Sequence, residues 1–206
     1  MKRQEEIIKE LTDEEVQKSL IYSQFLLLFI GIFLHFLFQR PLFKVEDFFL
    51  PSTYFWLYVV LPLIIVLSID LLIVKIFPGK WVDDGGINER LFKSLSFFQI
   101  IVFTLFIAIC EEYLFRYVIQ GQFGWIVASL IFALVHVRYL SKLILFLQVV
   151  LLSLALGWIY KETNSLAVMI LLHWLIDFIL GVLIKYDWMK GTEKGEGNGR
   201  SSRKVT

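Results

Sequence analysis

Long apolar stretches alternate with short polar segments along most of the chain. A membrane-spanning helix needs about 20 predominantly apolar residues. Six runs of roughly that length are predicted at 20–38, 54–77, 97–120, 124–137, 143–160 and 165–184. The run at 124–137 is short, so we expect it to be tilted or packed within a bundle. The pattern predicts an all-α fold, a polytopic transmembrane helical bundle of about six spans.

The two ends of the chain have a different character. Residues 1–19 are rich in charge, and Thr12 and Glu15 have the spacing of a helix capping box, so we expect a short amphipathic N-terminal helix. Residues 187–206 are rich in Gly and charge and are predicted to be a disordered tail. Between them, 20–186 is the predicted transmembrane domain.

Composition agrees with a membrane protein. Hydrophobic residues make up 58% of the chain and charged residues 19%, where soluble domains carry about 25% charged residues. The net charge of +1 gives no sign of a nucleic-acid partner. The single cysteine, Cys110, excludes an intramolecular disulfide and any multi-cysteine metal site.

The basic residues predict how the chain sits in the membrane. In a six-span arrangement, sixteen Lys and Arg residues fall on the side that holds both termini and three on the other. Because cytoplasmic loops carry an excess of Lys and Arg, we expect a multi-pass protein of the cell membrane with both termini in the cytoplasm.

Several polar side chains interrupt the apolar runs. An ionisable group at bilayer depth costs several kcal/mol, so each marks a candidate functional site. The ionisable ones are Asp70, Glu111, Glu112, Arg116 and Asp177, accompanied by His136 and His173. Gln99, Gln148 and Ser153 are expected to be helix–helix hydrogen-bond partners.

The spacing of these groups predicts which of them pair. Glu112 and Arg116 are four residues apart on one helix face, as are His173 and Asp177. Glu111 is rotated about 100° from Glu112 and must face another neighbour. Counting helical rise from the nearest turns places Glu111, His136 and His173 roughly 13–21 Å below the same membrane surface. Three helices therefore bring carboxylates and imidazoles together near mid-membrane.

This set of side chains suits the activation of water. A carboxylate held out of bulk water is a competent base, and an imidazole beside it can help to hold one water molecule. Neutral histidines can also donate hydrogen bonds to a developing oxyanion. No activated Ser or Cys and no His-Glu-x-x-His metal motif is evident. Attack of water on an acyl centre is the simplest inference.

Three ordered motifs on three hydrophobic segments resemble a known family. They are Glu111-Glu112-x-x-x-Arg116, Phe132-x-x-x-His136 and His173-x-x-x-Asp177. Together, over residues 97–180, they look like the CPBP (CAAX protease and bacteriocin-processing) family of intramembrane proteases. That family includes CAAX prenyl endopeptidases and the Abi, or bacteriocin-immunity, relatives. A chain this compact resembles its bacterial branch.

The resemblance implies a glutamate-type intramembrane endopeptidase and a role for each motif residue. Glu111 would be the base, with His136 beside the water, and Glu112 and Arg116 would support them. His173 and the last motif residue would line the oxyanion hole. That last position is often Asn in the family, but here it is Asp177, which accepts hydrogen bonds when ionised. We therefore expect Asp177 to orient His173.

The resemblance to the protease family also implies the expected partners, and alternative functions stay open. The partners are the lipid bilayer and a membrane-associated or lipid-modified peptide substrate. No cofactor is expected, and any metal present would be bound by Glu111, His136 and His173. One alternative is a non-catalytic membrane scaffold or bacteriocin-immunity-type binding protein. Another is a proton-coupled transporter, which the lack of a detectable repeat disfavours.

Overall fold

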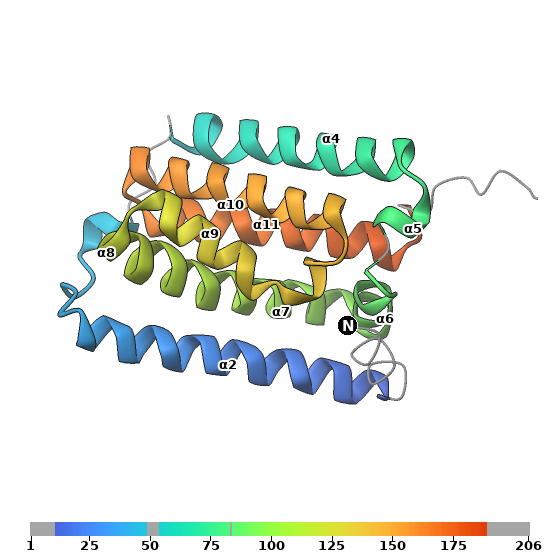
Figure 1. Ribbon diagram of the computed structural model, residues 1–206, viewed down its shortest axis with the longest axis horizontal. Coiled ribbons are helices and arrows are strands. Elements are labelled where there is room, and N and C mark those ends of the chain that lie inside the picture. The colour runs from blue at the N-terminus through green and yellow to red at the C-terminus, as the bar shows by residue number, and fades with distance from the viewer. Residues whose placement is uncertain (1–10, 49–53, 83, 189–206) are drawn as a thin grey trace, which may run out of the picture.

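The described part of the chain is helical throughout. The computed structural model describes residues 11–48, 54–82 and 84–188, and within these ranges no residue forms a strand (Figure 1). The all-α prediction is confirmed. The helices are α2 (Asp13–Leu37), η1 (Val45–Phe48), η2 (Phe55–Val60), α4 (Leu61–Ile76), α5 (Gly79–Val82), α6 (Ile87–Ser94), α7 (Phe97–Glu112), η3 (Tyr113–Gln120), α8 (Gly121–Phe123), α9 (Trp125–Val135), η4 (Val137–Tyr139), α10 (Leu143–Thr163) and α11 (Leu166–Lys185).

These helices account for the predicted spans. Five of the continuous helical segments are long and apolar enough to cross a membrane: Asp13–Leu37, Phe55–Ile76, Phe97–Phe123, Leu143–Thr163 and Leu166–Lys185. The short fourth run of the sequence is the apolar helix α9, Trp125–Val135. The fold is thus a bundle of about six spans, five of full length and one short.

The first span begins earlier than its apolar run. The capping box is present as predicted: Glu15 donates its backbone N–H to Thr12 Oγ1 (3.3 Å), and the Thr12 N–H is 2.7 Å from Glu15 Oε2. From Asp13 the helix continues without interruption to Leu37, so the charged segment up to residue 19 and the first span share one helix. Residues 1–10 and the predicted disordered tail from 189 lie outside the described residues.

The third span is the centre of the bundle. It consists of α7 continued by η3 and packs against α2 on one side and α11 and α9 on others (Figure 1). Glu112 and Arg116 on this span have no exposed surface. Since charged groups are not tolerated against lipid, the helix that carries them has to be enclosed by the other spans.

The hydrogen-bonding pattern of the third span changes directly after the two glutamates. From Tyr113 to Gln120 the turns widen to π-helical geometry. Single π-helical turns within α-helices occur frequently at functional sites. Here the widened turns begin between Glu112 and its partner Arg116.

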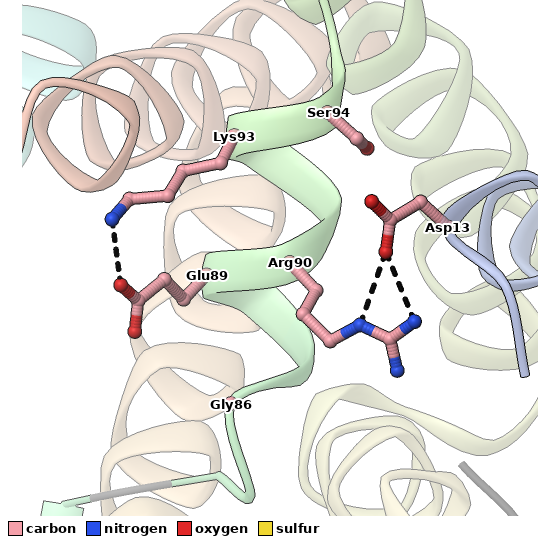
Figure 2. A pocket seen from close by; sticks show the side chains of 6 residues that line it. All are labelled: Asp13, Gly86, Glu89, Arg90, Lys93 and Ser94. Carbon is pink, nitrogen blue, oxygen red and sulfur yellow. Dashed lines mark hydrogen bonds and ion pairs between the residues drawn. The ribbon is translucent and has the colours of Figure 1, made fainter. Parts of the chain in front are cut away.

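A short amphipathic helix, α6, closes one end of the bundle. Its apolar side chains Ile87, Leu91 and Phe92 are buried, and it packs against α11 and α2. Arg90 donates to Asp13 Oδ1 of α2 from both Nε (3.1 Å) and Nη2 (2.9 Å), as Figure 2 shows. These groups border an open cavity of about 400 Å³, which is lined mainly by charged residues of α6 and by Asp13. The ion pair ties α6 to the start of the first span.

Candidate active site

Glu112 forms the centre of a fully buried ionic cluster. Its Oε2 accepts a hydrogen bond from Arg116 Nε at 3.1 Å, which is the predicted pair within the helix. Its Oε1 lies 2.7 Å from His173 Nδ1, which α11 supplies. Both carboxylate oxygens are therefore occupied by cationic or hydrogen-bonding partners from two helices.

Arg116 extends this cluster to the other side of the bundle. Its Nη2 donates to Ser153 Oγ of α10 at 3.1 Å, so Ser153 is an interhelical partner as predicted. Ser129 Oγ of α9 donates in turn to the Ser153 carbonyl at 2.9 Å. The guanidinium also lies over the ring of Phe132, 5.2 Å from its centroid. One arginine thus links the third span to α9 and α10.

Glu111 is buried but stands apart from the arginine. It is 7% exposed, and its Oε1 accepts a hydrogen bond from the neutral amide of Gln24 in α2, at 3.2 Å. It lies close enough to His173, His136 and Asp177 to interact with them electrostatically. The predicted difference in direction between Glu111 and Glu112 is thus present in the structure.

Gln24, which donates a hydrogen bond to Glu111, was not identified from the sequence. It is a single polar residue in a long apolar run, 87 positions from its partner, and it is 5% exposed. An uncharged amide in a span carries a weak signal, because such side chains commonly bond to neighbouring helices. Only the packing of α2 against α7 reveals its place beside Glu111.

His173 lies between two carboxylates. Besides Glu112 at Nδ1, its Nε2 is 3.4 Å from Asp177 Oδ2, one turn further along α11. Carboxylates accept hydrogen bonds, so both contacts are satisfied when each ring nitrogen carries a proton. Asp177 thus pairs with His173 as the helical spacing predicts, and its side chain is 29% exposed. The orienting role of Asp177 stays a prediction.

His136 occupies the point where α9 ends. Its Nδ1 is 2.8 Å from the carbonyl oxygen of Phe132, one turn earlier. A carbonyl can only accept, so this bond places the proton on Nδ1 and leaves the lone pair of Nε2 free. Within the described residues, the ring makes no hydrogen bond to either glutamate. It is half-buried and stands at the edge of the cluster.

The remaining polar residues of the spans divide into helix partners and caps. Gln148 Nε2 donates to Asp70 Oδ1 at 2.8 Å, which joins α10 to α4 as expected of Gln148. The expectation for Gln99 was wrong. It closes a capping box with Ser96, whose N–H is 2.7 Å from Gln99 Oε1, because it falls in the first turn of α7 where free backbone donors need acceptors.

No metal site is assembled among the residues that the structure describes. In those ranges no three His, Cys, Asp or Glu side chains are arranged to hold an ion, the set Glu111, His136 and His173 included. Metal-free hydrolysis stays a prediction, which chelation tests.

An apolar cavity lies beside the cluster, between α2, η3 and α9. It has a volume of about 300 Å³, and the side chains around it are all hydrophobic. Leu114 and Phe115 on its wall follow the two glutamates by one turn, and Val135 precedes His136. The polar site is thus bordered by a space suited to apolar groups.

Comparison with known proteins adds two findings. The sequence model of the family described as "Type II CAAX prenyl endopeptidase Rce1-like" matches residues 93–179, which contain all six candidate site residues. The chain is 41% identical over 133 residues to the "Uncharacterized protein YpbD" of Bacillus subtilis (strain 168). That alignment covers 65% of this chain and 70% of the relative. No solved structure matches.

Proposed function

Because the chain belongs to the Rce1-like family of type II CAAX prenyl endopeptidases, we propose that it is an intramembrane endopeptidase in which Glu111 activates water. The family makes it a membrane protease. The choice of Glu111 as base, the partner residues and the substrate are our proposal.

One observation carries the choice of base. Both oxygens of Glu112 are taken by Arg116 and His173, whereas Glu111 accepts a single hydrogen bond from a neutral amide. A carboxylate held by an arginine and an imidazole has little capacity to accept another proton. Glu111 keeps its capacity to accept a proton from water. In this proposal the free Nε2 of His136 accepts a hydrogen bond from the same water molecule.

The reaction then follows the usual course of acyl hydrolysis. Glu111 removes a proton from water while the water oxygen bonds to the peptide carbonyl carbon. The carbonyl π electrons move to the carbonyl oxygen, which becomes an oxyanion. When the oxyanion collapses, the carbon–nitrogen bond breaks. The proton held by Glu111 passes to the leaving nitrogen, and the carboxylate is restored.

His173 is the proposed donor to the oxyanion. Its Nδ1 contact with Glu112 is short, at 2.7 Å, and fixes the ring. Its Nε2 contact with Asp177 is longer, at 3.4 Å, so the same N–H can be shared between Asp177 and a developing oxyanion. A preorganised donor of this kind in a low-dielectric site contributes several kcal/mol to lowering the barrier. In this scheme Asp177 aims the ring and does not donate.

The substrate that suits this site is a membrane-associated or lipid-modified peptide. The scissile bond has to reach a polar cluster enclosed by hydrophobic helices. The apolar cavity of about 300 Å³ between α2, η3 and α9 offers space for an apolar part of such a substrate.

The test compares membrane proteomes of cells that carry the unaltered chain or Glu111→Gln. We expect at least one peptide to be shortened only with the unaltered chain, because loss of a general base costs about a hundredfold or more in rate. Glu162→Gln, an exposed carboxylate near the end of α10, is the matched control and should retain cleavage. Full processing by Glu111→Gln would show that the mechanism is wrong.

A further inference from the structure

The ring of His136 is held by more than its own helix. After α9 the chain turns through η4 (Val137–Tyr139), which brings the ring of Tyr139 parallel to that of His136. The two ring planes are 12° apart with centroids at 6.1 Å, and the ring of Phe132 lies 4.7 Å from His136 by the same measure. Tyr139 is buried although it lies outside the spans. The ring of Tyr139, three positions later, therefore helps to fix the orientation of the His136 ring.

Tyr139 is itself clamped from another segment. Asn88, in the first turn of α6, donates from Nδ2 to the Tyr139 hydroxyl at 3.3 Å, and its Oδ1 accepts from Arg138 Nη2 at 2.9 Å. Arg138 Nη2 also contacts that hydroxyl, and Nη1 lies 3.7 Å from Asp84. Burial raises the pKa of Tyr139, so the phenol remains neutral under ordinary conditions. Both ends of the Asn88 amide are used, which fixes its orientation.

The clamp rests on a well-anchored helix. Asp84 accepts from the Asn88 backbone N–H at 3.1 Å, ahead of α6. One turn later on the same side of α6, Phe92 packs closely on Gly181 of α11, and a Cβ added to Gly181 would lie 2.4 Å from the Phe92 ring. Asn88 is therefore fixed relative to α11, the helix that carries His173. The short surface helix connects two parts of the active site.

From these contacts we propose that Tyr139, held by Asn88 and Arg138, is a positioning residue that keeps His136 in the Nδ1–H tautomer with Nε2 facing the site. The proposal rests on the proposed function for the meaning of that orientation. Its physical content, a histidine ring fixed by a clamp from α6, can be measured without any substrate.

The experiment uses the full chain labelled with ¹⁵N-histidine in detergent. The sequence contains three histidines, so His35→Phe and His173→Asn suffice to assign the His136 signals. We expect a single Nδ1–H tautomer for His136 in the unaltered chain. In Tyr139→Leu the His136 ring is free to leave the Phe132 carbonyl, so a second tautomer of His136 should appear. Tyr139→Phe retains the aromatic face but loses the hydroxyl that Asn88 and Arg138 contact, so it should show the second tautomer to a smaller extent than Tyr139→Leu.

Two further variants keep the outcome decisive. Asn88→Leu removes the two side-chain contacts of Asn88, to Tyr139 and to Arg138, without altering the sequence of η4. It too should produce the second tautomer. Tyr22→Leu, which removes a 68% exposed tyrosine of α2, should not. Unchanged His35 and His173 signals verify the fold in each case. If Tyr139→Leu and Asn88→Leu both leave the His136 tautomer unchanged, the proposal is wrong, even if the protein proves to be a protease.

Discussion

Two adjacent glutamates in one helix differ in their surroundings because one residue of helix turns the side chain by about 100°. Glu112 points to the arginine one turn away and to His173, and its charge is balanced inside the bundle. Glu111 points to α2, where it accepts a hydrogen bond from the neutral Gln24 amide. The paired Glu112 is suited to holding helices together, and the less tightly held Glu111 is suited to accepting a proton.

Removing one partner of the buried pair should destabilise the protein strongly. Glu112→Gln leaves Arg116 with no balancing carboxylate, and Arg116→Leu leaves Glu112 with only His173. Breaking a buried pair in this way costs roughly 3–5 kcal/mol. Reversible unfolding in mixed detergent micelles should show this loss for both variants, together with loss of activity.

The exposed pair at the start of α2 provides a matched control. Glu14 and Lys18 have the same spacing of four residues and a contact of 2.6 Å, but both side chains are more than half exposed. Glu14→Gln should leave the unfolding midpoint unchanged, since exposed pairs contribute little. Equal effects of Glu14→Gln and Glu112→Gln would contradict the assigned role of burial.

Chelation tests the chemistry of the same residues. If Glu111 and His136 activate water without a metal, the purified protein should keep its full turnover after exhaustive dialysis against chelators. A zinc enzyme would lose activity and regain it on addition of the ion. Loss and recovery of this kind would replace our mechanism by a metal-dependent one.

At the scale of elements, α10 approaches the third span at a glycine. A Cβ on Gly157 would lie 2.8 Å from Ser129 Oγ, 3.2 Å from Gln120 Oε1 and 3.3 Å from Arg116 Nη1. Gln120 Nε2 also donates to the Gly157 carbonyl at 2.7 Å. The absence of a side chain lets α9, α10 and η3 bring their polar groups together around the arginine.

Gly157→Ala should therefore disturb the support of the site. The added methyl group has to displace Ser129 or the guanidinium, and overpacking of this kind costs typically about 1–3 kcal/mol. Thermal unfolding in detergent should show a lower midpoint. Gly79→Ala is the control, since a Cβ at Gly79 would meet nothing within 4 Å. An unchanged midpoint for Gly157→Ala would show that this contact relaxes freely.

At the scale of the whole molecule, several basic residues of the described chain gather at one end. The start of α2, helices α5 and α6, the turn η4 and the end of α11 lie together there, and the ends of α2 and α10 lie opposite (Figure 1). The first group of segments carries Lys18, Arg90, Lys93, Arg138 and Lys185. This arrangement agrees with the basic-residue pattern that predicts both termini in the cytoplasm.

Thiol labelling in cells should establish the orientation. In a Cys110→Ala background, cysteines introduced at Ser19 and Ser202 should react with a membrane-impermeant reagent only after the cells are opened. A cysteine at Glu162, on the opposite side, should react in intact cells. The reverse pattern, or labelling of Ser19 and Ser202 on different sides, would contradict the predicted topology.

The sequence by itself determined the features that depend on local geometry. Apolar run lengths give the spans, because a bilayer of fixed thickness requires helices of matching length. The Glu112–Arg116 and His173–Asp177 pairs follow from the helical repeat, and the capping box at Thr12 from its spacing. The resemblance to the protease family rests on these same short motifs.

Only the tertiary structure decided which helices face one another. The bonds Gln24–Glu111 and Glu112–His173 join residues 87 and 61 positions apart, and the clamp from Asn88 to Tyr139 spans 51. Gln99 was misassigned for the same reason, because its type alone does not distinguish a cap from an interhelical partner. Helical periodicity gives the direction of a side chain around its own axis, but the neighbour it meets depends on how the whole bundle packs.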